Sequence, residues 1–212
     1  MVTYMITKQV KQAGHLVVFI LTSLSVAVIL TTLVSPWLYH LFIKGLSLDQ
    51  VAGLPAGQLM ANYRYMVHYL LDPFQQVFEL PDFASSPAGK QHFVEVKHLF
   101  QLNGLLSLAL IWLTVWLNQR IKKGRYRKTY LPFFQFAVVL PLLLIFVMVL
   151  AFDQIFIAFH QLFFRNDLWL FDPLLDPIIT VLPQSFFLVL FIVVILFYEL
   201  VLLFIRWLFY RK

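Results

Sequence analysis

Four apolar runs, each about as long as a lipid bilayer is thick, limit the possible folds of this chain more than any other feature. They span residues 16–39, 100–117, 131–152 and 185–209. A helix needs about 20 apolar residues to cross roughly 30 Å of hydrocarbon. Because a backbone in lipid must satisfy its polar groups within the segment, these runs predict helices rather than strands. The predicted fold class is therefore an all-α membrane protein with four transmembrane helices.

Composition agrees with this class. Hydrophobic residues make up 61% of the 212 residues, and the mean hydropathy is +0.84. We therefore expect a single integral membrane domain over residues 1–212. The first apolar run is too long, and its end too poor in small residues, for a cleavable signal peptide.

The distribution of charge predicts the orientation of the helices. Eleven of the 16 Lys and Arg residues lie before the first run, in the short link at 118–130 or at the end of the chain. Nine of the ten Asp and Glu residues lie in the two longer loops, at 40–99 and 153–184. Basic segments stay in the cytoplasm, so both termini and the link are predicted to be cytoplasmic. The two loops are predicted to form a small extracytoplasmic cap. Because topology explains the basic residues, no nucleic-acid partner is expected.

The first outer loop contains an irregular stretch followed by two helical patterns. Residues 43–58 are punctuated by Gly and Pro and predict an irregular loop. The first helical pattern is at 60–71, where apolar and aromatic residues recur at a helical period. Ser86 followed by Pro87 is typical of a helix start. That helix is predicted to continue into the second span.

The second outer loop is predicted to begin as an extension of the third helix. It is then expected to break at two Asp-Pro pairs, which begin at Asp172 and Asp176. An Asp before Pro favours a turn or a helix cap. The alternative is that these carboxylates line a site.

Two histidines are the main candidates for catalysis. His92 and Glu95 are three residues apart and would share a helix face, so the carboxylate could orient the imidazole. The alternative for this pair is a solvated helix face. Since both loops leave the same face of the membrane, His92 and His160 are predicted to meet above the helix bundle.

His160 is followed within two turns by Arg165, Asn166 and Asp167. Ionisable groups near hydrocarbon are costly and usually functional, although an interfacial histidine can also serve as packing.

Several other chemistries lack support. The chain has no cysteine, which excludes disulfides, thiolate metal ligands and a Cys nucleophile. It has no G-x-S-x-G, no H-E-x-x-H and no glycine-rich phosphate loop. Two histidines with nearby carboxylates could hold zinc, but their spacing is not diagnostic. We predict no metal and no cofactor.

Three blocks of sequence resemble the lipoprotein intramolecular transacylase (Lit) family of Gram-positive bacterial membrane proteins. The blocks are "NYRYMVHYLL" at 62–71, "HFVEVK" at 92–97 and "FHQLFFRNDLWLFDPLLDPIITVLPQSFF" at 159–187. The second is similar to a His-x-x-Asp-Val segment of the family, with Glu95 in the place of Asp. The predicted spans and cytoplasmic termini also agree.

The resemblance implies an acyltransferase of the bacterial cytoplasmic membrane. Such an enzyme moves the sn-2 acyl chain of a diacylglyceryl-cysteine lipoprotein onto the α-amine of that cysteine, and the lyso-form lipoprotein results. The paired catalytic histidines would correspond to His92 and His160. The residues expected to bind or orient the substrate, a diacylated lipoprotein in membrane lipid, are Tyr63, Glu95, Arg165, Asn166, Asp167 and Trp169.

Histidine suits this chemistry. Aminolysis of an ester needs a neutral amine, and a free α-amine has a pKa of about 7.7–8.0. An imidazole can take its proton and later give one to the leaving oxygen. Two other readings remain open from the residues alone: a metal-dependent membrane hydrolase, and a non-enzymatic subunit or chaperone of an envelope complex.

Overall fold

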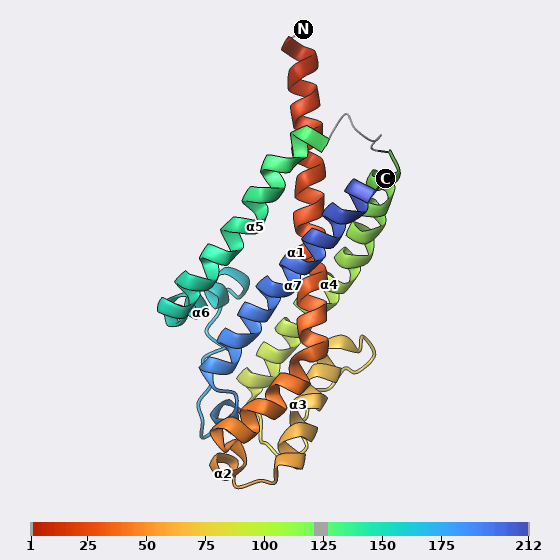
Figure 1. The fold of residues 1–212 in the computed structure, drawn as a ribbon. Helices are drawn as coiled ribbons and strands as arrows, with labels where there is room; N and C mark the ends of the chain where they lie inside the picture. The colour runs from red at the N-terminus through yellow and green to blue at the C-terminus, as the bar shows by residue number, and fades with distance from the viewer. Residues whose placement is uncertain (1, 121–126, 212) are drawn as a thin grey trace. The chain divides into compact units, whose positions relative to one another are not determined.

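The structure is a computed structural model that describes residues 2–120 and 127–211, with side chains over 12–120 and 135–208. No strand occurs in this part of the chain, which confirms the all-α prediction (Figure 1). Part of the predicted basic link at 118–130 lies outside the described residues. The elements are α1 (Val2–Leu46), α2 (Leu48–Ala52), α3 (Ala56–Leu71), α4 (Pro87–Arg120), α5 (Arg127–Leu150), α6 (Phe152–Phe163), the 3₁₀ helix η1 (Pro177–Val181) and α7 (Gln184–Arg211).

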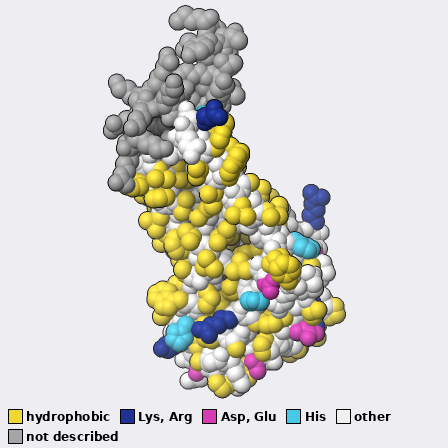
Figure 2. Space-filling model, turned by 90° about the vertical axis from the view of Figure 1, so that its right-hand side faces the viewer, with side chains coloured by type: hydrophobic (Ala, Val, Ile, Leu, Met, Phe, Trp, Pro, Cys, Tyr) yellow, Lys and Arg dark blue, Asp and Glu magenta, His cyan; other side chains and the backbone are white. Residues whose placement is uncertain are grey.

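Three of these helices are long and apolar enough to cross a membrane. They cover Gln12–Leu46, Pro87–Arg120 and Gln184–Leu208. A fourth crossing is possible if the bent pair Gln135–Leu150 and Phe152–Phe163 counts as one span. On the face shown in Figure 2, most of the described side chains are hydrophobic. Such a surface is what contact with lipid requires.

The prediction that the second outer loop extends the third helix is wrong. The chain bends by 110° between α5 and α6. Ala151 leaves the helical region, with φ −138° and ψ 39°. Asp153 then lies in the first turn of α6, where the helix dipole favours a negative charge. Its Oδ1 accepts a hydrogen bond of 2.9 Å from Gln184 Nε2, which ties the start of α6 to the start of α7.

The described chain divides into two compact units. The first comprises residues 1–30, 104–147 and 192–212. Hydroxyl pairs join α1 to α4 inside it: Thr22 Oγ1 lies 2.8 Å from Thr114 Oγ1, and the Ser25 and Ser107 hydroxyls also meet. Small hydroxyl-bearing residues let helices approach closely and bond across the interface in an apolar environment.

The second unit comprises residues 31–103 and 148–191, and it contains all the candidate site residues. Its core combines stacked aromatic rings with aliphatic side chains. Tyr39 of α1 stacks on Tyr63 of α3 at 4.3 Å, and both rings meet Phe186 edge-on. The Tyr39 hydroxyl donates to the carbonyl of Val181 at 3.0 Å. The predicted helix over 60–71 is confirmed as part of α3, and its buried face is what closes this core.

The prediction of an irregular loop over 43–58 is partly wrong, since the short helix α2 lies within it. Ser47 and Gly53 flank α2 in the left-handed conformation, with φ 51° and 65°. Leu48 is buried in the core of the second unit and anchors the short helix there.

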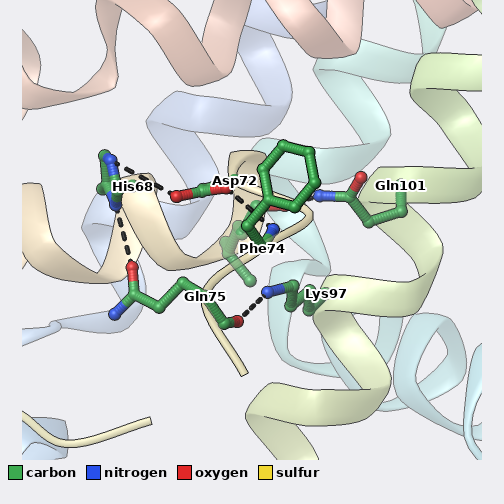
Figure 3. A network of polar contacts seen from close by, with 7 residues as sticks. His68, Asp72, Phe74, Gln75, Lys97 and Gln101 are labelled. Atoms are coloured by element: carbon green, nitrogen blue, oxygen red, sulfur yellow. Dashed lines mark hydrogen bonds and ion pairs between the residues drawn. The ribbon is translucent and has the colours of Figure 1, made fainter. Parts of the chain in front are cut away.

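Polar contacts fasten the connection between α3 and α4 to α4 itself (Figure 3). The buried Lys97 ammonium donates to the carbonyl of Gln75 and lies 4.4 Å above the Tyr69 ring. Gln101 Nε2 donates to the carbonyl of Leu70 at 2.9 Å. These bonds position the end of α3 and the segment that follows it beside residues 97–101 of α4.

The start of α4 confirms the prediction made from Ser86 and Pro87. Ser86 Oγ accepts a hydrogen bond of 2.9 Å from Gly89 N, as an N-cap does. The buried Asp176 carboxylate accepts bonds from Ser86 N at 2.8 Å and Ser86 Oγ at 2.6 Å. Asp172 Oδ1 accepts from Leu174 N at 2.9 Å within a turn. The prediction of a turn contact is therefore confirmed for Asp172, whereas the Asp176 side chain makes no cap bond at η1 and instead holds the N-cap residue of α4.

Candidate active site

The structure brings His92 of α4 and His160 of α6 together. Their ring centroids lie 5.9 Å apart, with an angle of 34° between the planes. Only 7% of His92 and 9% of His160 are exposed. Both residues lie outside the apolar runs at 100–117 and 131–152, although the candidate spans, which are counted as whole helices, include them.

The environment of His160 fixes its tautomer. Its Nδ1 lies 2.7 Å from the carbonyl oxygen of Phe156, and since a carbonyl can only accept, Nδ1 carries the proton. Nε2 is then the ring nitrogen with a free lone pair. Trp169 stacks on the imidazole at 4.6 Å, and the Phe156 ring lies 4.2 Å away.

His92 lies among aromatic rings. Phe164 and Phe171 meet its imidazole edge-on at 4.7 Å and 5.6 Å. Within the described chain its Nδ1 is buried without a hydrogen-bond partner. An unsatisfied buried polar atom of this kind costs about 1–3 kcal/mol, which a substrate atom bonded to it would recover.

Both imidazoles are held in the neutral form. The pKa of His92 is lowered to about 4, first by burial and second by the neighbouring His160, while Glu95 opposes the shift. Burial also lowers the pKa of His160, against the bond to the Phe156 carbonyl. A neutral pair can accept one proton and donate another at neutral pH.

The contact of Glu95 differs from the one expected. Asn166 Nδ2 donates to Glu95 Oε1 at 3.0 Å and to Oε2 at 3.2 Å. The carboxylate thus bonds to an amide 71 positions away rather than to the imidazole one helical turn before it. Asn166 is brought to the site by this bond.

The remaining predicted residues fall into two groups. Trp169 stacks on His160 and belongs, with Phe156, Phe164 and Phe171, to the aromatic cage around the two histidines. Arg165 and Asp167 are exposed. Tyr63 is buried in the core against Tyr39 and Phe186, and its described ring contacts do not include either histidine.

Sequence reasoning missed the aromatic residues of the cage, namely Phe156, Phe164 and Phe171. The signal that could have found them is the density of Phe, Trp and Leu around the polar residues of 156–171. In the part of the chain that the structure describes, no group of three or more His, Asp or Glu residues could hold a metal ion.

The sequence matches one family of known proteins. This family, described as Lipoprotein intramolecular transacylase Lit, matches the chain over residues 14–187. Among curated proteins, none matches.

Solved structures of the membrane integral lipoprotein intramolecular transacylase Lit from Bacillus cereus are similar at 26% identity. One has a TM-score of 0.74 and covers 93% of this chain and 95% of its own. Two others carry a histidine substitution. The arginine variant has a TM-score of 0.75 and covers 98% of this chain and 94% of its own. The alanine variant has a TM-score of 0.75 and covers 97% and 95%.

Proposed function

Since this chain belongs to the lipoprotein intramolecular transacylase family, we propose that it moves the sn-2 acyl chain of a diacylglyceryl-cysteine lipoprotein onto the α-amine of the same cysteine. Family membership makes it a multi-pass membrane enzyme of acyl transfer that acts on lipoproteins. The observation that carries the proposed chemistry is the pair of buried neutral histidines, 5.9 Å apart.

His160 is the proposed general base. Its Nδ1–H is engaged by the Phe156 carbonyl, so Nε2 faces the reaction as an acceptor. As the cysteine nitrogen attacks the sn-2 ester carbonyl, the new N–C bond forms and Nε2 takes the proton from nitrogen. When the C–O bond of the ester breaks, the same proton passes to the glycerol oxygen, which leaves as a hydroxyl. No other reactant is consumed.

His92 is the proposed hydrogen-bond donor to the ester carbonyl oxygen. Its buried Nδ1 has no partner among the described residues, and a neutral imidazole can donate one N–H. A donor aimed at the developing oxyanion strengthens its bond as charge accumulates, which lowers the barrier. This role needs the uncharged ring that burial favours.

Positioning supplies the rest of the rate. The amine and the ester belong to one molecule, and well-oriented intramolecular reactions reach effective molarities of about 10⁵–10⁸ M. A covalent acyl-enzyme is then unnecessary, and the chain has no cysteine to form a thioester.

The proposed topology has four spans, both termini in the cytoplasm and the histidine pair at the extracytoplasmic face. Support comes from the basic residues concentrated at the ends of the chain and at 118–130. The lipid-anchored substrate reaches the site from the outer leaflet. Arg165, exposed beside the cage, is suited to contact the glycerol oxygens.

A double-labelled substrate tests the proposal. The purified protein in lipid is incubated with two synthetic diacylated lipopeptides, one with a heavy peptide and the other with a deuterated sn-2 chain. We expect the deuterated acyl chain to appear as an amide only on the light peptide that carried it, and the heavy peptide to carry only an unlabelled acyl chain. Tandem mass spectrometry distinguishes these products. Crossed products, free fatty acid or no conversion would overturn it.

A further inference from the structure

The carboxylate of Glu95 lies at one end of a chain of contacts that leads to His160. All of its members belong to the second unit. Both carboxylate oxygens accept from Asn166 Nδ2, at 3.0 Å and 3.2 Å. A hydrogen bond to a charged group is stronger than a neutral one, so this bond fixes the loop after α6 to the side of α4.

Asn166, held in this way by Glu95, in turn positions the indole of Trp169. The amide oxygen of Asn166 accepts from Leu168 N at 3.1 Å, which holds the turn. The backbone carbonyl of Asn166 accepts from Trp169 Nε1 at 3.1 Å. An indole has only this one donor, so the bond sets the rotation of the ring.

Trp169 in turn determines where the imidazole of His160 lies. The two rings stack at 4.6 Å with 28° between their planes. The bond from His160 Nδ1 to the Phe156 carbonyl, at 2.7 Å, holds one atom of the ring, and the Phe156 ring packs 4.2 Å away. The stacked indole adds a second close ring contact that limits the tilt of the imidazole and so helps to fix the direction of Nε2.

We infer that Glu95 is a positioning residue, which acts through Asn166 and Trp169 to aim His160 Nε2 at the reacting atoms. This inference rests on the proposed function. Glu95 then contributes to the rate without touching the substrate or giving His92 a counter-ion. An error of about 1 Å in the placement of a catalytic group can cost 10²-fold in rate, so the contribution is measurable.

A double-mutant cycle on the full-length enzyme in lipid tests the inference. Trp169→Phe keeps an aromatic ring beside His160 and removes the indole N–H, whereas Glu95→Ala removes the anchor. We expect each to lower kcat about tenfold with KM within about twofold of wild type. Because both substitutions interrupt the same series of contacts, the kcat of the double variant should also fall about tenfold rather than a hundredfold.

Conservative and control variants separate positioning from general damage. Glu95→Gln keeps an oxygen that can accept from Asn166 Nδ2, so it should retain most of the wild-type kcat. Glu79→Ala, which removes a carboxylate whose side chain is 70% exposed, and Trp112→Phe, at a ring 68% exposed, should leave kcat unchanged. If Glu95→Ala does not accumulate, Asn166→Ala replaces it in the cycle, since it breaks the same chain at the next contact.

Two results would overturn the inference: losses that multiply to about a hundredfold in the double variant, or an effect of Glu95→Ala confined to KM. His160→Ala in the same assay separates this from the proposed function. If His160→Ala retains wild-type activity, the proposed chemistry fails. If it is inactive while the losses multiply, only the positioning chain fails.

Discussion

Replacing Gly89 with alanine should weaken the start of α4, although alanine is the better helix former. A Cβ at Gly89 would lie 2.2 Å from Asp176 Oδ1 and 2.9 Å from its Cγ. These distances are shorter than real contacts, so the buried Asp176 carboxylate has to move. Its two hydrogen bonds to Ser86, at 2.8 Å and 2.6 Å, would then break.

The size of the effect follows from these contacts. A hydrogen bond to a charged group contributes about 1.5–3 kcal/mol, so the loss of two costs about 3–6 kcal/mol. The higher helix propensity of alanine returns up to about 1 kcal/mol. A net loss of about 2–5 kcal/mol lowers the thermal midpoint of a chain of this size by roughly 4–20 °C. The assay is thermal unfolding of the purified protein in lipid or detergent.

Matched variants make this prediction specific. Gly104→Ala lies on the same helix with nothing within 4 Å of the added Cβ, so its midpoint should not fall. In an Asp176→Ala background the obstructing carboxylate is absent, and Gly89→Ala should raise the midpoint instead of lowering it. A midpoint of Gly89→Ala at or above wild type, with Asp176 intact, would refute the steric reasoning.

Two further predictions concern stability and pH. Lys97→Met leaves the Gln75 carbonyl without its donor and removes the cation above Tyr69. It should cost about 1–3 kcal/mol in thermal unfolding, whereas Lys90→Met, at a half-exposed ion pair 3.8 Å long, should change little; equal effects would contradict the contacts of Lys97. Because burial lowers the pKa of His160, its base form persists below the usual 6.5 as pH falls. Single-turnover rates should fall about tenfold per pH unit below the pKa of the substrate amine, near 8, and steepen only below pH 6.5. Steepening above pH 6.5 would contradict a buried neutral base.

Features set by local chemistry could be predicted from the sequence. Ser86 and Pro87 mark the start of α4 because an N-cap hydroxyl and a proline at the first helical position act within one turn. The apolar period over 60–71 gave α3 because its buried face needs no knowledge of its partner. The proximity of His92 and His160 could also be predicted, because the charge distribution predicts that both outer loops lie on the same face of the membrane.

Features set by distant partners could not be predicted. Glu95 pairs with Asn166, 71 positions away, and no local pattern distinguishes this partner from the nearer His92. Asp176 reaches Ser86 across 90 positions. The bend between α5 and α6 depends on the conformation of Ala151 and the tie of Asp153 to Gln184.

The most direct measurement on the histidine pair is the single-turnover rate of O-to-N acyl transfer by His160→Ala and His92→Ala, with thermal midpoints as a check on folding. Loss of the general base should slow transfer by about 10²–10⁴-fold, and loss of the oxyanion donor by about 10²–10³-fold. Folded variants that both transfer the acyl chain within a few-fold of the wild-type rate would contradict catalysis by these two imidazoles.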